Sequence, residues 1–524
     1  MSGGLHALGK VAIASHSPLA SAIALKIIEK SGNAVDAAVT ASLLLNALEP
    51  GWSGLGGGGF ALVYSEELGF KALDYRETAP LNVKPDEYRC EEDLSVGYKA
   101  VATPGTLRGL WALHQELGEM DWSRILDFVV EYSRRCRASR LWSTCMRANL
   151  DGALRKLAIC PESYATFLRD GEVYPEGAEV SFARLIETLN MIREGVCRFY
   201  EGELADDIDR IFSGNNAFLS SRDLARYSPI WREPIISELD IRGRELKVVA
   251  MPPPSSGALL AKALKILSLM RLNAENYFLK LAYTLFHIID ARCSLIGDPA
   301  FNNIDARIYL SDSHVEETLR LIEEGKLTPH PTRDSGGTSH ISVADVRSRT
   351  CISLTETIEC FMGSGVTVRG VLLNDEMHDF TLQKGHPNSI APGKRPASSM
   401  SPLMILDAEE AFPEIIIGAS GGMRIISSII QVLSNHLLRG MDPISAILEG
   451  RLHVRGERIA LEELLEDKIS SSLSMAGLRL ERVREISMYP GTDLYFGAVQ
   501  AIFKKNDLFL AVSDPRKQPG AAAR

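Results

Sequence analysis

A chain of 524 residues is long enough to bury more than one hydrophobic core, and its hydrophobic content of 45% and charged content of 24% are typical of a soluble globular protein. The formal net charge of −10 excludes the overall positive field with which proteins gather nucleic acid or anionic lipid, so we expect neither as a partner. The 8 cysteines are scattered without a CxxC pair, which favours reduced packing thiols over a disulfide framework or a zinc site.

Two consecutive helices are predicted near the N-terminus. Residues 17–18 (SP) supply a capping serine and a proline at the first helical position, and residues 19–30 then follow helical spacing. Residues 34–48 form a second apolar helical segment, which an aspartate interrupts and which is too short to span a bilayer. Because residues 1–10 also lack the features of a secretory leader, we expect a cytoplasmic protein without a membrane anchor.

A glycine-rich segment follows at residues 54–60 (GLGGGGF). Phosphate-binding loops also contain runs of glycine, but they continue into a Lys-Ser/Thr pair and a helix N-terminus. Here no such pair follows, and residues 60–64 alternate as a strand does. We therefore expect these glycines to let the backbone approach another segment closely.

The middle of the chain is predicted to be mainly helical from residue 94 to residue 288. Within it, residues 251–257 (MPPPSSG) form a rigid entry to a helix that begins near Ala258. Residues 313–337 are polar, contain prolines and end in a Gly-Gly step. This composition predicts an exposed linker, which is the kind of segment where a chain can be cut.

Strand patterns begin directly after the linker. Residues 340–346 and 350–359 both alternate and are joined by a short polar turn, which predicts a β-hairpin. With the turn centred near Ser348, antiparallel pairing places Thr338 roughly opposite residues 357–359.

Residues 336–343 (GGTSHISV) form the most informative stretch of the sequence. A flexible Gly-Gly step leads into a hydroxyl residue that opens a strand. If the chain were cut before Thr338, that residue would carry both a nucleophilic hydroxyl and an α-amine able to serve as its base. Taken alone, the stretch also fits a glycine-rich turn into an ordinary strand.

A series of short motifs resembles the gamma-glutamyltranspeptidase (glutathione hydrolase) family, whose members are N-terminal-nucleophile hydrolases. The resemblance covers nearly the whole chain, and the motifs are specific because they occur together in this order. They are residues 32–38 (GNAVDAA), 54–60 (GLGGGGF), 75–80 (YRETAP), 103–106 (TPGT), 252–257 (PPPSSG), 338–342 (TSHIS), 373–380 (LNDEMHDF), 394–402 (KRPASSMSP), 418–425 (GASGGMRI) and 513–516 (SDPR).

The resemblance implies an α+β fold, the αββα four-layer sandwich in which two stacked, mainly antiparallel sheets lie between helical layers. It also implies autocleavage between Gly337 and Thr338. The products would be a helix-rich large subunit, 1–337, and a strand-rich, nucleophile-bearing small subunit, 338–524, which stay associated.

The resemblance further implies a reaction in which Thr338 attacks the γ-glutamyl amide of glutathione or another γ-glutamyl compound. The amine leaves, and water, or an amino acid or peptide acceptor, takes the acyl group from the resulting ester. By family position Thr357 supports the nucleophile, and Gly421 and Gly422 form the oxyanion hole, where N–H groups without a neighbouring Cβ can approach closely. No cofactor and no metal are implied.

Substrate recognition by such an enzyme needs a cation for the α-carboxylate and acceptors for the α-ammonium. Arg76, on the large subunit, matches the family's carboxylate-binding arginine, a role for which a bidentate guanidinium is suited. Ser398 and Ser399 match the serines that also hold the carboxylate. Glu376 and Asp379 match the positions that bind the ammonium.

The sequence departs from the family pattern at Glu359, where many members carry asparagine, and we place this residue with the substrate-binding group. Its charge beside Glu376 and Asp379 predicts coupled titrations and an unusual pH dependence of substrate binding. Residues 380–393 are also short where many members have a loop over the bound glutamyl group. This shortness predicts an open site that accepts longer γ-glutamyl chains and favours hydrolysis over transfer.

Alternative functions follow from the same residues. A related acylase for glutaryl or cephalosporin side chains would use the same nucleophile without needing an ammonium pocket. A non-catalytic amino-acid-binding protein on the same scaffold would have no use for Thr338. A metal hydrolase built on Glu376, His378 and Asp379 is chemically conceivable, but the other histidines are scattered and there is no HExxH motif. His340 is more simply a strand histidine than a base.

Overall fold

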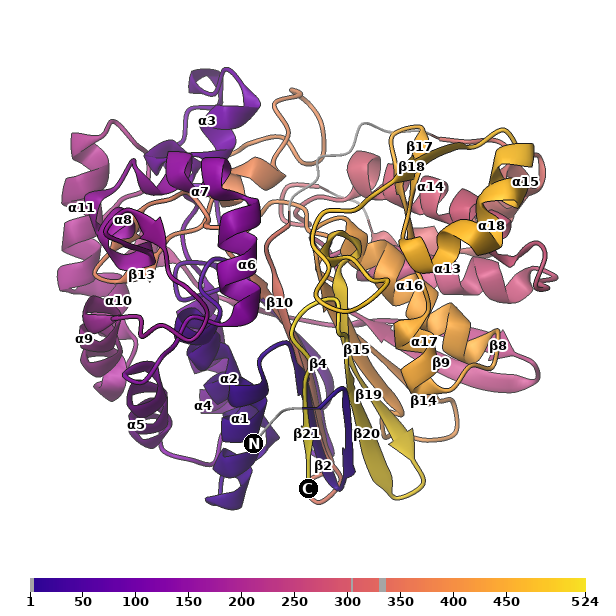
Figure 1. Ribbon diagram of the computed structural model, residues 1–524, viewed down its shortest axis with the longest axis horizontal. Coiled ribbons are helices and arrows are strands. Elements are labelled where there is room, and N and C mark those ends of the chain that lie inside the picture. The colour runs from indigo at the N-terminus through magenta and orange to yellow at the C-terminus, as the bar shows by residue number, and fades with distance from the viewer. Residues whose placement is uncertain (1–3, 303–304, 329–335) are drawn as a thin grey trace.

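The computed structural model describes residues 4–302, 305–328 and 336–524 of the protein. Two seven-stranded antiparallel sheets are stacked face to face, and helices lie on the outer side of each (Figure 1). This arrangement confirms the α+β sandwich that the sequence motifs imply.

The hairpin sheet, named for the predicted hairpin that it contains, has the strand order β21-β2-β10-β11-β3-β4-β7. Its strands are β21 (Gly520–Ala523), β2 (Val11–Ser15), β10 (Ser339–Asp345), β11 (Thr350–Thr357), β3 (Gly58–Ser65), β4 (Gly69–Tyr75) and β7 (Ile230–Arg232). The facing sheet has the order β1-β20-β19-β15-β14-β9-β8. Its strands are β1 (His6–Gly9), β20 (Leu508–Ser513), β19 (Ala498–Lys505), β15 (Ile415–Ser420), β14 (Leu403–Asp407), β9 (Arg244–Ala250) and β8 (Ile235–Ile241).

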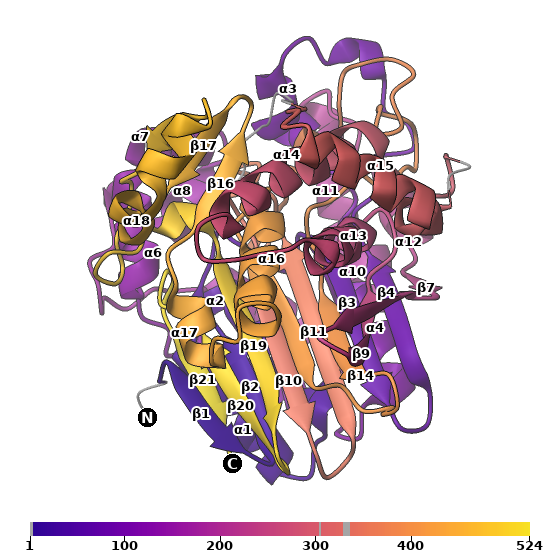
Figure 2. The same ribbon diagram turned by 90° about the vertical axis from the view of Figure 1, so that its right-hand side faces the viewer.

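The helices on the two outer sides come from different parts of the chain (Figures 1 and 2). On the side of the hairpin sheet are α1 (Pro18–Glu29), α2 (Ala34–Leu48), α3 (Glu91–Ser95), α4 (Thr106–Leu117), α5 (Trp122–Ser133), α6 (Arg140–Ala148), α7 (Leu150–Leu157), α8 (Pro161–Phe167), α9 (Ala183–Met191), α10 (Cys197–Glu201), α11 (Glu203–Gly214) and α12 (Ser221–Arg226). On the side of the facing sheet are α13 (Gly257–Leu269), α14 (Tyr277–Leu295), α15 (Asp312–Glu323), α16 (Arg424–Leu437), α17 (Pro443–Leu448) and α18 (Glu463–Met475).

Smaller pairings complete the secondary structure outside the two large sheets. They are formed by β5 (Leu168–Arg169), β6 (Glu172–Val173), β12 (Thr367–Val368), β13 (Val371–Leu372), β16 (Leu452–Arg455), β17 (Arg458–Leu461) and β18 (Arg479–Arg482). Within the described residues, we find no helix with the length and apolar character needed to cross a bilayer.

The central strands of the hairpin sheet are buried on both faces. On β3, Ala61 and Val63 pack into the core beneath the N-terminal helices, whereas Phe60 and Leu62 pack into the core between the two sheets. Alternate residues of the strand therefore face two different hydrophobic cores, and neither face of the strand is exposed to solvent.

The two N-terminal helices and the hairpin agree with the sequence predictions. The Ser17 side chain caps α1, and Asn33 forms a capping box at α2. In the hairpin, Ser339 pairs with Glu356, so that continuing the ladder by one residue places Thr338 opposite Thr357. The predicted register is therefore confirmed.

Two predictions about the middle of the chain were wrong in part. The region predicted to be mainly helical also contains β7, β8 and β9, and the predicted linker contains α15. On α15 the buried residues Val315, Thr318 and Ile322 recur at helical spacing, so the helix packs despite its polar composition. Residues 329–335 of the predicted linker lie outside the described residues.

The segments before and after Gly337 are interleaved in both sheets. In the hairpin sheet, β10 and β11 lie between β2 and β3, and β21 pairs with β2. In the facing sheet, β1 pairs with β20, and β9 pairs with β14. The two segments therefore share both sheets and do not form separate globular units.

Candidate active site

A cavity of about 600 Å³ lies beside the start of β10. Most of the predicted site residues line it, although they come from distant parts of the sequence. They are Thr338, Thr357, Glu359, Asp379, Ser398, Ser399 and Gly422. The other predicted residues, Arg76, Glu376 and Gly421, are not part of this lining as far as the described chain extends.

Thr338 is held tightly by its surroundings. Its φ of 141° lies in a region that a β-branched residue rarely adopts, so the backbone is strained there. The preceding residue, Gly337, packs so closely on Glu359 that a Cβ would overlap the Glu359 carbonyl oxygen. The ammonium of Lys517 donates a hydrogen bond of 2.8 Å to the Thr338 carbonyl. The predicted cleavage site is thus both strained and fixed in place.

Thr357 connects the predicted nucleophile to the acidic side of the cavity. Its hydroxyl accepts a hydrogen bond of 2.8 Å from the backbone N–H of Glu359. Glu359 itself has a φ of 72°, a left-handed conformation that costs energy for a residue with a side chain. The hydrogen bond from Glu359 to Thr357 supports that conformation at the cavity wall.

Gly421 and Gly422 form a tight turn between β15 and α16. Their φ angles are 122° and 59°, which favour glycine. A Cβ at Gly421 would lie 2.7 Å from the Cα of Gly497, so the turn has no room for a side chain. The predicted oxyanion hole and a strand-to-helix turn are therefore the same structure.

Arg76 lies in a buried acidic cluster behind the cavity wall. Its guanidinium pairs with Glu376 at 2.5 Å, with Glu77 at 3.4 Å and, more closely, with Asp379. Burial raises the pKa of Glu376 and of Asp379, and it raises the pKa of Glu77 to about 7. The Arg76 guanidinium therefore contacts three carboxyl groups, which favours keeping a proton within the cluster.

Arg292, on α14, is a cavity residue that the sequence analysis missed. Its Nε donates to Ser399 Oγ at 3.3 Å, and its Nη2 donates to the Ala397 carbonyl at 3.0 Å. The same Nη2 lies 4.0 Å from Asp379. It thus brings a buried positive charge to the serine pair that is predicted to hold a carboxylate, and no motif in the sequence marks it.

Lys517 is a second residue that sequence reasoning missed, although it directly follows the motif at residues 513–516. Its side chain is buried, and Nζ lies 5.2 Å from the centre of the Trp52 ring. Burial lowers the pKa of Lys517 to about 8. A charged residue directly after an Asp-Pro-Arg motif was the available signal.

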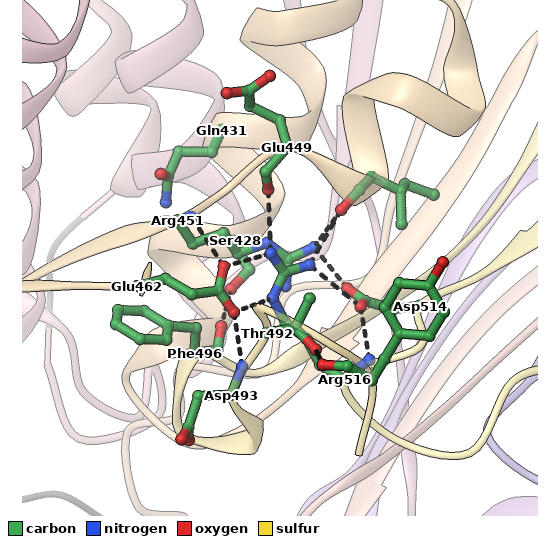
Figure 3. A network of polar contacts seen from close by, with 12 residues as sticks. Ser428, Gln431, Glu449, Arg451, Glu462, Thr492, Asp493, Phe496, Asp514 and Arg516 are labelled. Atoms are coloured by element: carbon green, nitrogen blue, oxygen red, sulfur yellow. Dashed lines mark hydrogen bonds and ion pairs between the residues drawn. The ribbon is translucent and has the colours of Figure 1, made fainter. Parts of the chain in front are cut away.

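A buried ionic network holds the segment that leads to Lys517 (Figure 3). Arg516 pairs with Glu462 and, at 3.2 Å, with Asp514. Arg451 pairs with Asp514 at 2.5 Å and donates to the Gly497 carbonyl at 2.6 Å. The network therefore fixes both the approach to Lys517 and the residue on which Gly421 packs.

The structure also bears on the minor sequence hypotheses. Gly56, Gly57 and Gly59 press against the backbone of neighbouring segments, as expected for a close approach. His340 is buried, hydrogen-bonded to Thr355 and Ser342, and its pKa is lowered to about 3 by burial, so it resembles a satisfied strand histidine.

The hypothetical metal trio does not assemble. Across the described ranges, Glu376, His378 and Asp379 do not bring their ligand atoms together as one group. His378 lies instead beside Glu359 and Cys360.

Comparisons with known proteins place these features in a family. The family model for gamma-glutamyltranspeptidase matches residues 20–524. A glutathione hydrolase proenzyme of Bacillus subtilis (strain 168) is 31% identical over 481 residues, covering 84% of this chain and 80% of the relative. A glutathione hydrolase proenzyme of Pseudomonas aeruginosa is 29% identical over 541 residues, covering 96% of this chain and 93% of the relative.

Solved structures give a similar result. Cephalosporin acylase from Bacillus halodurans has a TM-score of 0.88 and 25% identity, covering 99% of this chain and 97% of the acylase. Gamma-glutamyltranspeptidase from Helicobacter pylori has a TM-score of 0.53 and 26% identity, covering 58% of this chain and 90% of the other.

Proposed function

Since this chain belongs to the gamma-glutamyltranspeptidase family, we propose that it is a glutathione hydrolase with Thr338 as its nucleophile. The donor would be glutathione or another γ-glutamyl compound. Hydrolysis would be favoured over transfer to an amino acid or peptide, because water enters an open cavity of about 600 Å³ easily.

Activation would require hydrolysis of the peptide bond between Gly337 and Thr338. This step consumes one water, leaves a carboxylate on Gly337 and frees the α-amine of Thr338. The strained φ of Thr338 supports the proposal, because an N-terminal residue has no φ restraint and cleavage removes the strain. Strain of this kind is worth about 1–3 kcal/mol.

In the proposed reaction, the α-amine of Thr338 takes the proton of its own hydroxyl, and the oxygen attacks the γ-carbonyl carbon. Gly421 and Gly422 would donate N–H groups to the oxyanion, as their glycine-only turn allows. The amine product leaves with the transferred proton. Water then attacks the γ-glutamyl ester on Thr338, which releases glutamate and restores the hydroxyl.

Recognition of the glutamyl group would use two sets of residues in the cavity wall, which adjoin each other at Arg292. Ser398 and Ser399 would hold the α-carboxylate. Glu359 and Asp379 would bind the α-ammonium, with Glu376 contributing from behind. Arg76 would position Glu376 and Asp379 through its ion pairs with them, in addition to attracting the α-carboxylate of the substrate.

The observation that carries the proposal is the position of Thr338 at the edge of the cavity, with the oxyanion turn and the acidic group on its walls. The test is the intact mass of the purified wild type, of Thr338→Ala and of Thr338→Ser. We expect two fragments that meet at residues 337 and 338 in the wild type and in the serine variant, and one uncut chain in the alanine variant. A single uncut and inactive wild-type chain would contradict the proposal.

An acylase without an ammonium requirement is a second candidate, favoured by the full-length match to cephalosporin acylase. Two anilide donors separate the candidates, because γ-glutamyl and glutaryl p-nitroanilide differ only in the α-ammonium. A glutathione hydrolase prefers the γ-glutamyl donor, and Glu359→Gln reduces that preference. A higher kcat/KM for the glutaryl donor would establish the acylase instead.

A further inference from the structure

Three side chains with metal-binding atoms meet beside the predicted nucleophile. Glu359 and Cys360 follow β11, and His378 lies on the short helix η5 (Glu376–Asp379). Cys360 Sγ lies 3.6 Å from His378 Nδ1, and Glu359 Oε1 lies 3.5 Å from the same nitrogen. All three ligand atoms lie within 4.8 Å of one another.

These separations match those around a tetrahedral zinc ion. With metal–sulfur and metal–nitrogen distances of about 2.3 and 2.05 Å, tetrahedral geometry separates a thiolate from an imidazole nitrogen by about 3.6 Å. The same geometry separates an imidazole nitrogen from a carboxylate oxygen by about 3.4 Å. The donor set of one thiolate, one imidazole and one carboxylate is also one that zinc accepts.

The backbone under the three residues is fixed by contacts of its own. Asp375 Oδ1 accepts a hydrogen bond of 2.9 Å from the Cys360 N–H, and the Asp375 carbonyl accepts one of 3.0 Å from the His378 N–H. Lys156 pairs with the same carboxylate at 3.0 Å. Such support holds ligand side chains in position before an ion arrives.

We propose that Glu359, Cys360 and His378 form a binding site for Zn²⁺ or a similar borderline divalent cation. The carboxylate, the thiolate and Nδ1 would supply three ligands, and a water from the cavity would complete the tetrahedron. Burial raises the pKa of the Cys360 thiol, so the free protein holds the proton, which passes to solvent when the Cys360 sulfur–metal bond forms.

The alternative cluster of Glu359, Glu376 and Asp379 is less suited to a cation. Arg76 already pairs with Glu376 and Asp379, so an ion there would have to compete with a buried guanidinium. At the proposed site, His378 Nδ1 lies 3.5 Å from Glu359 Oε1, and the buried ammonium of Lys156 pairs with Asp375 at 3.0 Å instead of with one of the three ligands.

Binding at this site has a consequence that rests on the proposed function. Glu359 would serve both as a ligand of the cation and as an acceptor for the donor ammonium. The cation and the γ-glutamyl donor would therefore exclude each other, and micromolar zinc would reversibly inhibit the enzyme.

Cobalt(II) absorbance tests the site without using activity. The cleaved, full-length protein is titrated with Co²⁺, and a thiolate-to-cobalt charge-transfer band is expected in the wild type. The band is absent in Cys360→Ser and present in Cys293→Ser, which removes the thiol of a different cysteine, one that lines the cavity. Absence of the band in the wild type, or its persistence in Cys360→Ser, overturns the proposed site.

Kinetics test the consequence separately. Zn²⁺ is expected to inhibit hydrolysis of γ-glutamyl p-nitroanilide competitively, and Cys360→Ser to raise the inhibition constant by about 10- to 100-fold or more with its basal rate retained. A cobalt band without any inhibition by zinc overturns the proposal that the cation and the γ-glutamyl donor exclude each other. An enzyme inactive on every γ-glutamyl donor refutes the proposed function, whereas the cobalt spectrum still decides the metal site.

Discussion

Lys517 places a buried positive charge against the backbone of the predicted nucleophile. Its hydrogen bond of 2.8 Å to the Thr338 carbonyl remains available after cleavage, because that carbonyl belongs to the small subunit. A cation at this range disfavours protonation of the new α-amine, which must be neutral to act as the base. Lys517 can therefore serve both to position the nucleophile and to tune its amine.

We predict that Lys517→Met lowers kcat by about tenfold or more and changes the pH profile. The pKa of Lys517 is about 8, so the wild type should lose activity as the pH rises through that value and the ammonium loses its proton. In the variant, this loss of activity at high pH should be absent. The loss of activity at low pH, where the Thr338 α-amine is protonated, should begin at a higher pH because no neighbouring ammonium disfavours that protonation. The measurement is kcat/KM against pH.

The Lys517→Met variant is expected to fold. Burial lowers the pKa of Lys517 from 10.5 in the unfolded chain to about 8 in the folded protein. The buried ammonium therefore lowers the free energy of unfolding below pH 8, and this destabilisation decreases as the pH rises from 8 to 10.5. Removing the charge therefore does not destabilise the protein at pH 7. Lys504→Met, which removes a lysine paired with Glu410 near the surface, is the matched control. An unchanged pH profile in Lys517→Met contradicts the assigned role.

Arg292 is predicted to attract the α-carboxylate, because it holds Ser399 at the cavity wall. Arg292→Gln should raise KM for γ-glutamyl p-nitroanilide by about 10- to 100-fold, the loss expected for a charged hydrogen bond. It should leave KM for 4-aminobutyryl p-nitroanilide, which lacks only the carboxylate, nearly unchanged. Arg307→Gln alters an exposed arginine and is the control. Equal losses on both donors would indicate a purely structural role.

At the scale of elements, the turn between β15 and α16 is the most constrained part of the site. Gly421→Ala combines an unfavourable φ with a contact to Gly497, so the N–H groups of the turn must move. We predict a fall in kcat of about 100-fold or more, as for loss of an oxyanion donor. Gly440 also has a positive φ, of 74°, but the atom nearest to a Cβ there would be Arg242 Nη1 at 4.0 Å, so Gly440→Ala should cost stability without affecting kcat. Comparable kcat values for the two variants would refute the oxyanion assignment.

The hairpin shows how far local sequence can predict structure. Its two alternating strands and short turn were enough to predict that Thr338 lies roughly opposite residues 357–359, and the observed ladder places it opposite Thr357. The strand β8 also alternates between buried and exposed residues, but it lies within the region that was predicted to be mainly helical and was missed. The helix α15 was missed because its few buried residues are diluted by charges.

Local sequence could not predict the contacts of Arg292 and Lys517 with the site. Arg292 reaches Ser399 from 107 positions away, and Lys517 reaches Thr338 from 179 positions away. Neither contact can be inferred from local spacing or composition, because each arises only when distant segments of the chain pack together. Most of the residues predicted from the family resemblance line the cavity, but the resemblance did not predict the burial of Arg76 among three carboxyl groups.

For the whole molecule, the interleaving of strands determines what happens after cleavage. Both sheets contain strands from before and after Gly337, so separating the fragments would break β2 from β10, β3 from β11 and β1 from β20. We predict that the two fragments co-elute under native conditions and unfold in one thermal transition. They should separate only in denaturant. Independent elution under native conditions would contradict this prediction.

The pairing of the chain ends has a further consequence. His6 pairs with Val512, and Ala12 pairs with Ala523, so the two sheets are complete only when β20 and β21 have been placed. Lys517 lies between those last two strands and reaches Thr338 only then. Contacts between such distant residues form late in folding. If the proposed cleavage depends on Lys517, we expect a variant that lacks β20 and β21 to remain uncut at Thr338.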